Sequence, residues 1–350
     1  MYRRRIPKVD EKPKIPDNLE EFGYVLKENG ELRSNNEADQ PYVFDYLPKD
    51  KPYNEDRYDK FMELVGDIVE DRLQQEPFNF QKVLVPSGAD PAKDVHSYIY
   101  MTPNAMTTTG KLMVMIPGIS TRIGQWSQRI MCDTNIQSGS MMEISEMVFE
   151  KGYEVIILNP NANFWYNGRA NMVPQKHTSV VVTVPDSDTP EAHCQYVFHN
   201  FVRHAKAEKV AIIANGWGAH GFVLTLNTEF DYIKDHVKAV AMTNSVHMKD
   251  AVKGEKERAF VYNNCCNWSA SVDKKGTLVP DIRLGCTNIA SGEAIADYTL
   301  PTMLKDIMNY IFVRMGDIEW ESESDDDEPK ELTEEDLEVL SQIDVLSTNA

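Results

Sequence analysis

The stretch Lys209–Val223, KVAIIANGWGAHGFV, is the most informative one about the fold. Its first seven residues form a short apolar run, and such a run is typical of a central strand whose two faces are both buried. The run ends in the Gly-rich turn Asn215-Gly216-Trp217-Gly218, after which an amphipathic helix is expected. A strand, a sharp turn and a helix in this order predict one repeat of a parallel α/β sheet.

Other runs of the same kind extend this alternation in both directions along the chain. Further strands are expected at His96–Met101, Leu112–Pro117, Glu154–Asn159, Ser179–Val184, Lys238–Asn244 and 281–286. Helices are expected at residues 55–75, at Met142–Lys151, from Thr189-Pro190-Glu191 onward, and at Leu300–Arg314. Apolar strands alternating with amphipathic helices indicate a mostly parallel sheet with helices on both faces.

The turn after Asn215 has the setting of a nucleophile elbow but not its chemistry. An α/β-hydrolase-like fold places its nucleophile on a strained strand-to-helix turn with the pattern G-x-S-x-G. Here the tip of the turn is Gly216, flanked by Trp217 and Gly218. Because glycine adopts the strained backbone at little cost, the turn can persist without a nucleophilic oxygen.

The general base of such a site is also missing from its expected position. In this fold the histidine comes after the last strand, which predicts a loop near residues 286–298. The last of the eight histidines is His247, so that loop contains none. Loss of a triad member costs roughly 10⁴-fold in rate. The sequence therefore predicts no serine-type acyl transfer.

Two other serines are weak alternative nucleophiles. Ser120 follows the strand at Leu112–Pro117, in a loop that usually supplies oxyanion donors. Ser245 lies near His247, but residues two apart rarely face each other productively. A vacated site that keeps its cavity could instead bind a ligand or a peptide. The candidate pocket residues are Gly118, Ser120, Trp126, Trp165, Trp217 and His247.

Cofactor and membrane signals are weak throughout the chain. The five cysteines are odd in number, and the adjacent pair Cys265 and Cys266 does not fit zinc spacing, so no metal or other cofactor is expected. No apolar run approaches the roughly 20 residues of a membrane span, and the charged N-terminus does not resemble a signal peptide. The expected location is the nucleus, the cytoplasm or both.

The two ends of the chain differ in charge from the middle. Residues 1–18 are basic, punctuated by proline and predicted to be disordered. Residues 315–350 are expected to form an acidic tail, since 317–340 carry thirteen acidic side chains against Lys330 and the formal net charge is −19. A net negative chain without an aromatic and basic stripe argues against direct nucleic-acid binding.

The acidic tail carries two further signals. Ser322 and Ser324 stand among acidic residues, and phosphorylation there would deepen the negative charge. Thr333 then precedes three acidic residues and a leucine-rich spacing, which predicts a short amphipathic helix. That helix could dock in a partner's groove or fold back on its own domain.

Several stretches together resemble the Argonaute-binding (Arb-type) domain family, in its cotranscriptional-regulator branch. They are LEEFGYVLKENGELR (19–33), IGQWSQRI (123–130), GYEVIILNPN (152–161), TPEAHCQYVF (189–198), the elbow segment, VAMTNSVH (240–247) and NCCNW (264–268). The resemblance covers about residues 19–314. It implies an α/β-hydrolase-like fold and partners in Argonaute-linked silencing, heterochromatin or splicing. Some members keep a serine at the position of Gly216 and an aspartate at that of Asn244.

Residues and resemblance together predict a non-catalytic scaffold in small-RNA-linked or cotranscriptional gene regulation. It would act through protein partners, among them Argonaute, chromatin or splicing factors. The alternative is an esterase-like hydrolase with a non-standard nucleophile, for which Ser120 and Ser245 are the candidates.

Overall fold

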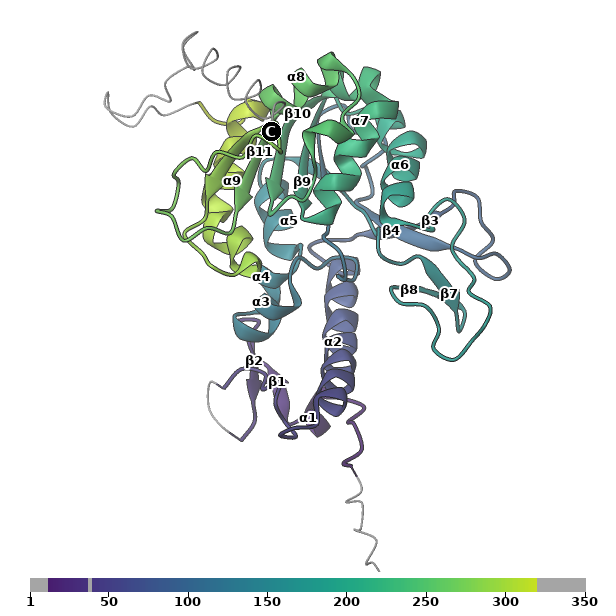
Figure 1. Cartoon of the computed structure of the whole chain (residues 1–350). Coiled ribbons are helices and arrows are strands. Elements are labelled where there is room, and N and C mark those ends of the chain that lie inside the picture. The colour runs from purple at the N-terminus through teal and green to yellow at the C-terminus, as the bar shows by residue number, and fades with distance from the viewer. Residues whose placement is uncertain (1–11, 37–39, 320–350) are drawn as a thin grey trace, which may run out of the picture.

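The computed structural model describes residues 12–36 and 40–319 and is built around an eight-stranded sheet (Figure 1). In spatial order the strands are β12 (Thr287–Ala290), β11 (Cys265–Ser269), β10 (Val237–Thr243), β9 (Lys209–Asn215), β5 (Lys111–Ile116), β6 (Tyr153–Ile157), β4 (Ser97–Met101) and β3 (Gln81–Val85). The six strands from β12 to β6 run parallel, while β4 and β3 are antiparallel to their neighbours. The fold is therefore the predicted α/β-hydrolase-like one.

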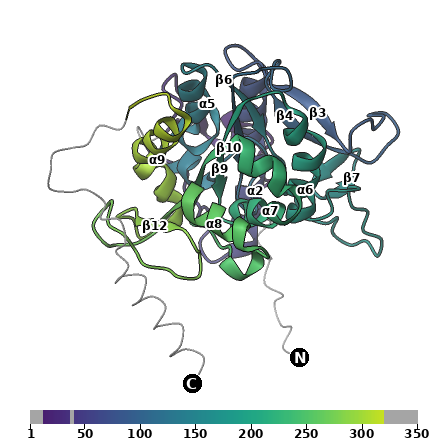
Figure 2. The ribbon, with the colours of Figure 1, turned by 90° about the horizontal axis from the view of Figure 1, so that it is seen from above.

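Helices cover both faces of the sheet, as Figure 2 shows from above. One face packs against α2 (Lys51–Gln74), α3 (Gln128–Asp133), α4 (Ile136–Gly139), α5 (Met142–Phe149) and α9 (Thr299–Met315). The other packs against α6 (Pro190–Asn200), α7 (Trp217–His236) and α8 (Glu255–Asn264). Met113 faces the first layer and Leu112 the second, because side chains alternate along a strand. This explains why the strand sequences are apolar throughout.

Smaller elements extend beyond the sheet. At the lower end of Figure 1, α1 (Leu19–Phe22) and the hairpin of β1 (Tyr24–Leu26) and β2 (Leu32–Ser34) lie beside α2. A second hairpin, β7 (Phe164–Tyr166) with β8 (Arg169–Asn171), projects on the side of β3 and β4. The 3₁₀ turns are η1 (Val202–His204), η2 (Lys249–Ala251) and η3 (Ala296–Tyr298). After α9, the carboxylate of Asp317 accepts hydrogen bonds from Lys111 and Tyr153.

Two expected strands are wrong. Residues 179–184 form no strand among the described elements, and only Thr183 makes an isolated bridge, to Phe164. Residues 281–286 form a turn in which Arg283 pairs with Asp281 at 2.7 Å. The last strand is β12, and the segment NCCNW supplies β11, which periodicity did not reveal because two of its five residues are polar.

Most residues at the two chain ends, for which disorder and an acidic tail are expected, lie outside the described part of the chain. Within residues 12–18 the backbone is irregular, and Lys12 pairs with Asp50 at 2.6 Å. Ser322, Ser324 and the helix expected after Thr333 lie outside the described part of the chain.

Candidate functional site

The elbow between β9 and α7 has the strained geometry that the sequence predicts. Gly216 has φ +50° and ψ −113°, and a Cβ placed on it would meet only the carbonyl oxygen of Asn244, at 3.9 Å. The space would admit a Cβ, although the positive φ would strain any residue that carries one, and the residue present has no side chain. At Gly218 a Cβ would come within 2.4 Å of the Pro117 carbonyl oxygen. This glycine lets helix α7 start directly against strand β5.

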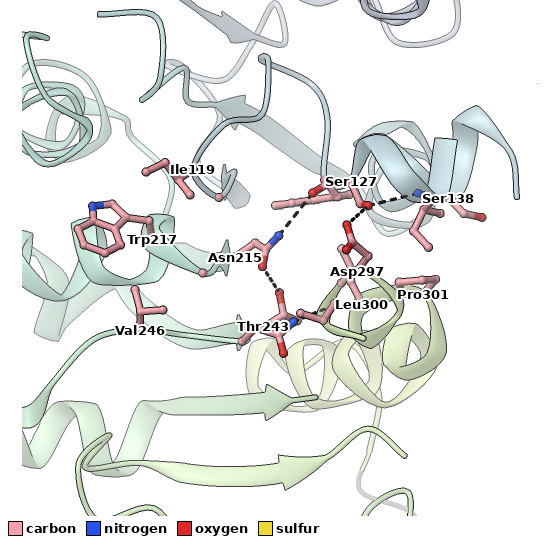
Figure 3. Close-up of a pocket in the computed structure, with 16 residues that line it drawn as sticks. Ile119, Ser127, Ser138, Asn215, Trp217, Thr243, Val246, Asp297, Leu300 and Pro301 are labelled. Carbon is pink, nitrogen blue, oxygen red and sulfur yellow. Dashed lines mark hydrogen bonds between the residues drawn. The ribbon is translucent and has the colours of Figure 1, made fainter. Parts of the chain in front are cut away.

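A cavity of about 240 Å³ lies over the elbow (Figure 3). Its mouth is apolar: Ile119, Trp217 and Val246 are 60 %, 38 % and 48 % exposed. The remaining wall comes from the β5–α3 loop, α3, α4, the ends of β9 and β10, the turn η3 and the start of α9. Those residues are Gly118, Trp126, Ser127, Ile130, Ser138, Asn215, Gly216, Thr243, Asn244, Ala296, Asp297, Leu300 and Pro301.

A hydrogen-bonded pair of polar side chains lies at the far side of the cavity from the mouth. The hydroxyl of Ser127 donates to Oδ1 of Asp297 at 2.5 Å (Figure 3). Nε of Arg129 lies 3.6 Å from Oδ2 of the same carboxylate. Asp297 follows the last strand, where a hydrolase of this fold would carry its histidine. No sequence signal points to this carboxylate, because the pattern of the fold predicts a histidine in that loop.

Asn215 and Thr243 lie between the mouth and this pair, as Figure 3 shows. Oδ1 of Asn215 accepts a hydrogen bond from the Thr243 hydroxyl at 3.2 Å, and its Nδ2 lies 3.5 Å from the carbonyl oxygen of Trp126. The indole Nε1–H of Trp126 is buried and has no hydrogen-bond partner among the described residues. A buried donor without an acceptor is unusual, because leaving it unpaired costs about 1–3 kcal/mol.

Asn244, where some relatives are expected to carry an aspartate, joins three chain segments. Its Oδ1 accepts from the amide of Ala270 at 2.7 Å and from the Thr299 hydroxyl at 3.2 Å. Its Nδ2 donates to the carbonyl oxygen of Ala296 at 2.9 Å. A carboxylate could not make that donation, so the amide fits this position as a structural bridge.

Ser245 and His247 do face each other, contrary to the sequence-based expectation. Nε2 of His247 lies 2.7 Å from the carbonyl oxygen of Leu284, which can only accept, so Nε2 carries the proton. Nδ1 therefore accepts from the Ser245 hydroxyl, at 2.5 Å. Burial lowers the pKa of His247 below its ordinary value, which keeps the imidazole neutral. Their neighbour Val246 lies on the cavity wall, whereas Ser245 and His247 are outside the set of lining residues.

The structure separates other expected pocket residues from the cavity. Ser120 is exposed, has φ +60°, and lies outside the cavity wall. Trp165 is on β7, where its ring contacts His96 with centroids 4.9 Å apart. Ser120 is in the loop after β5 and Trp165 is in a hairpin beyond the sheet, and the direction of both segments depends on tertiary packing. Gly118, Trp126 and Trp217 do line the cavity.

A second serine–histidine pair, Ser187 and His193, is fully buried, and His193 lies on helix α6. Nε2 of His193 accepts from the amide of Asn159 at 3.0 Å, so its Nδ1 carries the proton and donates to the Ser187 hydroxyl at 2.8 Å. Burial lowers the pKa of His193 to about 3. A serine that accepts from the imidazole is not activated, and this pair has a structural role.

Comparison with known proteins identifies the family. A model described as the Arb2 domain matches residues 15–275. The chain belongs to the Arb2 domain family. A cotranscriptional regulator ARB2A homolog from Xenopus tropicalis is 31 % identical over 331 residues, covering 81 % of this chain and 77 % of the relative. Human cotranscriptional regulator ARB2A is 30 % identical over 329 residues, covering 81 % and 78 %.

Solved structures resemble this Arb2 domain protein more distantly. A chain in the structure of the histone deacetylase Clr3 aligns with 14 % identity and a TM-score of 0.46, over 78 % of this chain and 41 % of that one. Carboxyl esterase 2 from Tuber melanosporum aligns with 11 % identity and a TM-score of 0.36, over 72 % and 97 %. At these scores neither similarity supports a functional argument.

Residues 12–36 and 40–319 contain neither a metal-ligating cluster nor a membrane-spanning helix. No group of three or more histidine, cysteine, aspartate or glutamate side chains in that part could hold a metal ion. No helix there is long and apolar enough to cross a membrane.

Proposed function

We propose that this Arb2 domain protein is a non-catalytic, hydrolase-like interaction protein in cotranscriptional gene regulation. The observation that carries the proposal is the elbow itself: Gly216 stands at its tip, and Asp297 lies in the loop where the base would belong. Without a nucleophilic oxygen and an imidazole, only binding and oxyanion effects are left to such a site. The curated relatives are named as regulators and not as enzymes.

The finer part of the proposal concerns location and partners. We infer that the protein works in the nucleus through protein partners, with Argonaute-linked silencing, chromatin or splicing factors as the candidates. Direct nucleic-acid binding is not part of the proposal, because the net charge of −19 opposes it. Affinity capture from cells, with the full chain and with a chain lacking residues 317–350, tests which partners depend on the tail.

Chemical probes test catalytic silence directly. The full-length protein is incubated with a fluorophosphonate and with a panel of short acyl esters. We expect no saturable labelling and no turnover above that of a heat-denatured sample. Saturable labelling that disappears in one serine variant would contradict the proposal and identify the nucleophile.

A second candidate function, an esterase-like hydrolase, is favoured by the contact between Ser245 and His247. The imidazole has the tautomer of a general base, and its acceptor nitrogen points at the hydroxyl. The same serine oxygen also accepts the backbone amide of His247 at 3.3 Å, which is the geometry of a local turn. Ser245→Ala would abolish any labelling that this pair supports, and Ser120→Ala serves as the matched control.

A further inference from the structure

We propose that residues 179–183 form a sheet edge through which two copies of this chain pair, antiparallel and about a two-fold axis. The segment has the sequence Ser-Val-Val-Val-Thr and follows the β7–β8 hairpin. An exposed strand edge with unpaired backbone groups is a template for another strand, and most proteins cover or interrupt such edges. This pairing is a property of assembly that goes beyond the proposed function.

The inner edge of the segment is already paired with strand β7. The amide of Trp165 donates to the carbonyl oxygen of Val182 at 2.9 Å. The amide of Val184 donates to the carbonyl oxygen of Asn163 at 2.8 Å. Because successive residues of a strand direct their backbone groups to opposite sides, the odd-numbered residues of the segment direct theirs away from β7.

The outer edge of the segment is open to solvent. Among the residues that the structure describes, none forms a hydrogen bond with the backbone amide or carbonyl group of Val181 or Thr183. Val180, Val181 and Val182 are 68 %, 52 % and 43 % exposed, so the side chains on both faces of the segment also contact solvent. Residues 178–184 carry no charged side chain and no proline that would hinder an added strand. An apolar edge of this kind is typical of a binding surface.

A second copy of the chain fits this edge because the segment is almost a palindrome. When two copies pair antiparallel about a two-fold axis at Val181, that residue lies opposite its own copy, and their outward-facing amide and carbonyl groups can bond to each other. Val180 then lies opposite Val182 of the second copy, and Ser179 lies opposite Thr183. Each valine therefore meets a valine and each hydroxyl residue meets a hydroxyl residue, which are favourable cross-strand pairs.

The charges that flank the segment complement each other in the same arrangement. Lys176 lies three residues before Ser179, and Asp186 lies three residues after Thr183. Antiparallel pairing brings the start of one segment beside the end of the other, so each Lys176 lies at the same end as the second copy's Asp186. In the single chain, the Lys176 ammonium is 3.9 Å from the carboxylate of Asp56, and both side chains are exposed. Such a surface contact is weak, so Lys176 is free to reorient.

Most of the negative charge of the chain is attached away from this edge. The formal net charge is −19, and residues 317–340 carry thirteen acidic side chains against Lys330. Asp317 follows α9, and Figure 1 and Figure 2 both show α9 and β7 on opposite sides of the molecule. Screening over about 8 Å at physiological salt further limits repulsion between two copies. Two five-residue edges form an interface below about 1,200 Å², so the pairing should be weak and reversible.

Sedimentation velocity on the full-length protein tests the pairing, at about 0.15 M salt and from about 1 to about 500 µM protein. We expect a concentration-dependent equilibrium between monomer and dimer. No larger species should form through this edge, because two-fold pairing uses the same edge of both copies and closes the assembly.

Substitutions at Val181 identify the edge and the axis. Val181→Lys and Val181→Glu each place like charges opposite one another and should weaken dimerisation at least about tenfold. An equimolar mixture of the two variants should recover association, because a lysine then faces a glutamate. Val181→Pro removes the amide that donates across the axis and should also weaken the dimer. Val272→Lys changes an 80 % exposed valine in the loop after β11 and, as the matched control, should dimerise like the unmodified chain.

A monomer at every concentration would overturn the inference and would leave the edge to an extended segment of another protein. A dimer that neither Val181→Lys nor Val181→Pro weakens would overturn it too, because that dimer would use another surface. A mixture of the two charged variants that stays monomeric would refute the two-fold register. Catalytic silence is tested separately by the fluorophosphonate assay, so the two proposals can fail independently.

Discussion

Replacing Glu70 with glutamine tests the buried network that holds the cavity wall in place. Glu70 is on α2 and is 4 % exposed in its side chain. It accepts hydrogen bonds from the hydroxyls of Tyr98 and Tyr100, at 2.5 and 2.7 Å, and from Nε of Arg122, at 2.5 Å. Arg122 is in the loop between β5 and α3 that also carries Gly118 and Trp126 of the cavity.

The size of the effect follows from the charge and burial of this carboxylate. Removing one partner of a buried ion pair typically costs about 3–5 kcal/mol. Glutamine keeps the volume and one acceptor oxygen, so we expect about 3 kcal/mol of lost unfolding free energy. For a chain of this length that corresponds to a fall of roughly 4 °C in Tm.

Thermal unfolding followed by circular dichroism at pH 7 measures the loss, with Glu63→Gln as the matched control. Glu63 is on the same helix, but its ion pairs with Lys60 and Arg169 are solvent-exposed and should contribute less than about 1 kcal/mol. Equal Tm values for the two variants would refute the reasoning that the buried network dominates.

Acid should reduce the difference in Tm between the unmodified chain and Glu70→Gln. Burial alone would raise the pKa of Glu70, but Arg122, the two tyrosine hydroxyls and Lys82 hold it below its ordinary value. A carboxyl with a lowered pKa in the folded state stabilises the protein above its unfolded pKa, near 4.3, and loses that contribution as pH falls through the folded value. A difference in Tm that grows below pH 4 would contradict this assignment.

Three further predictions concern single positions. Gly218→Ala should lower the free energy of unfolding by about 1–3 kcal/mol, as measured by chemical denaturation. The new Cβ would lie 2.4 Å from the Pro117 carbonyl oxygen, and this overpacking outweighs the gain in helix propensity. Burial lowers the pKa of His193 to about 3, so below pH 6.5 the unfolded chain binds more protons than the folded chain. The free energy of unfolding should therefore fall by about 1.4 kcal/mol per pH unit from pH 6.5 toward pH 3. A pH series of unfolding curves should show no such slope for His193→Gln. Burial raises the pKa of Cys132 to about 12, so iodoacetamide at pH 8 should modify it in unfolded but not in folded protein, as mass spectrometry would show.

Much of the sheet could be read from the sequence. The runs in β5, β6, β9 and β10 are apolar at nearly every position, since strands covered by helices on both sides bury both faces. The helix that begins at Pro190 was predicted from its cap, and the Thr189 hydroxyl does accept the amide of Ala192, at 3.1 Å. Residues 179–184 are β-branched, which is typical of a strand, but Val180, Val181 and Val182 are exposed, so no buried face fixes them in the sheet. Residues 281–286 form a turn instead, in which Arg283 pairs with Asp281.

The residue types alone establish that the elbow tip has no side chain and that no histidine follows His247 in the chain. Only folding in three dimensions brings Asp297 to Ser127, 170 positions away, and buries the indole N–H of Trp126 where no described residue accepts from it. It also decided that Ser245 faces His247. Local patterns fix strands and turns through short-range sterics, whereas a site is assembled from loops that meet only when the ends of parallel strands come together at one edge of the sheet.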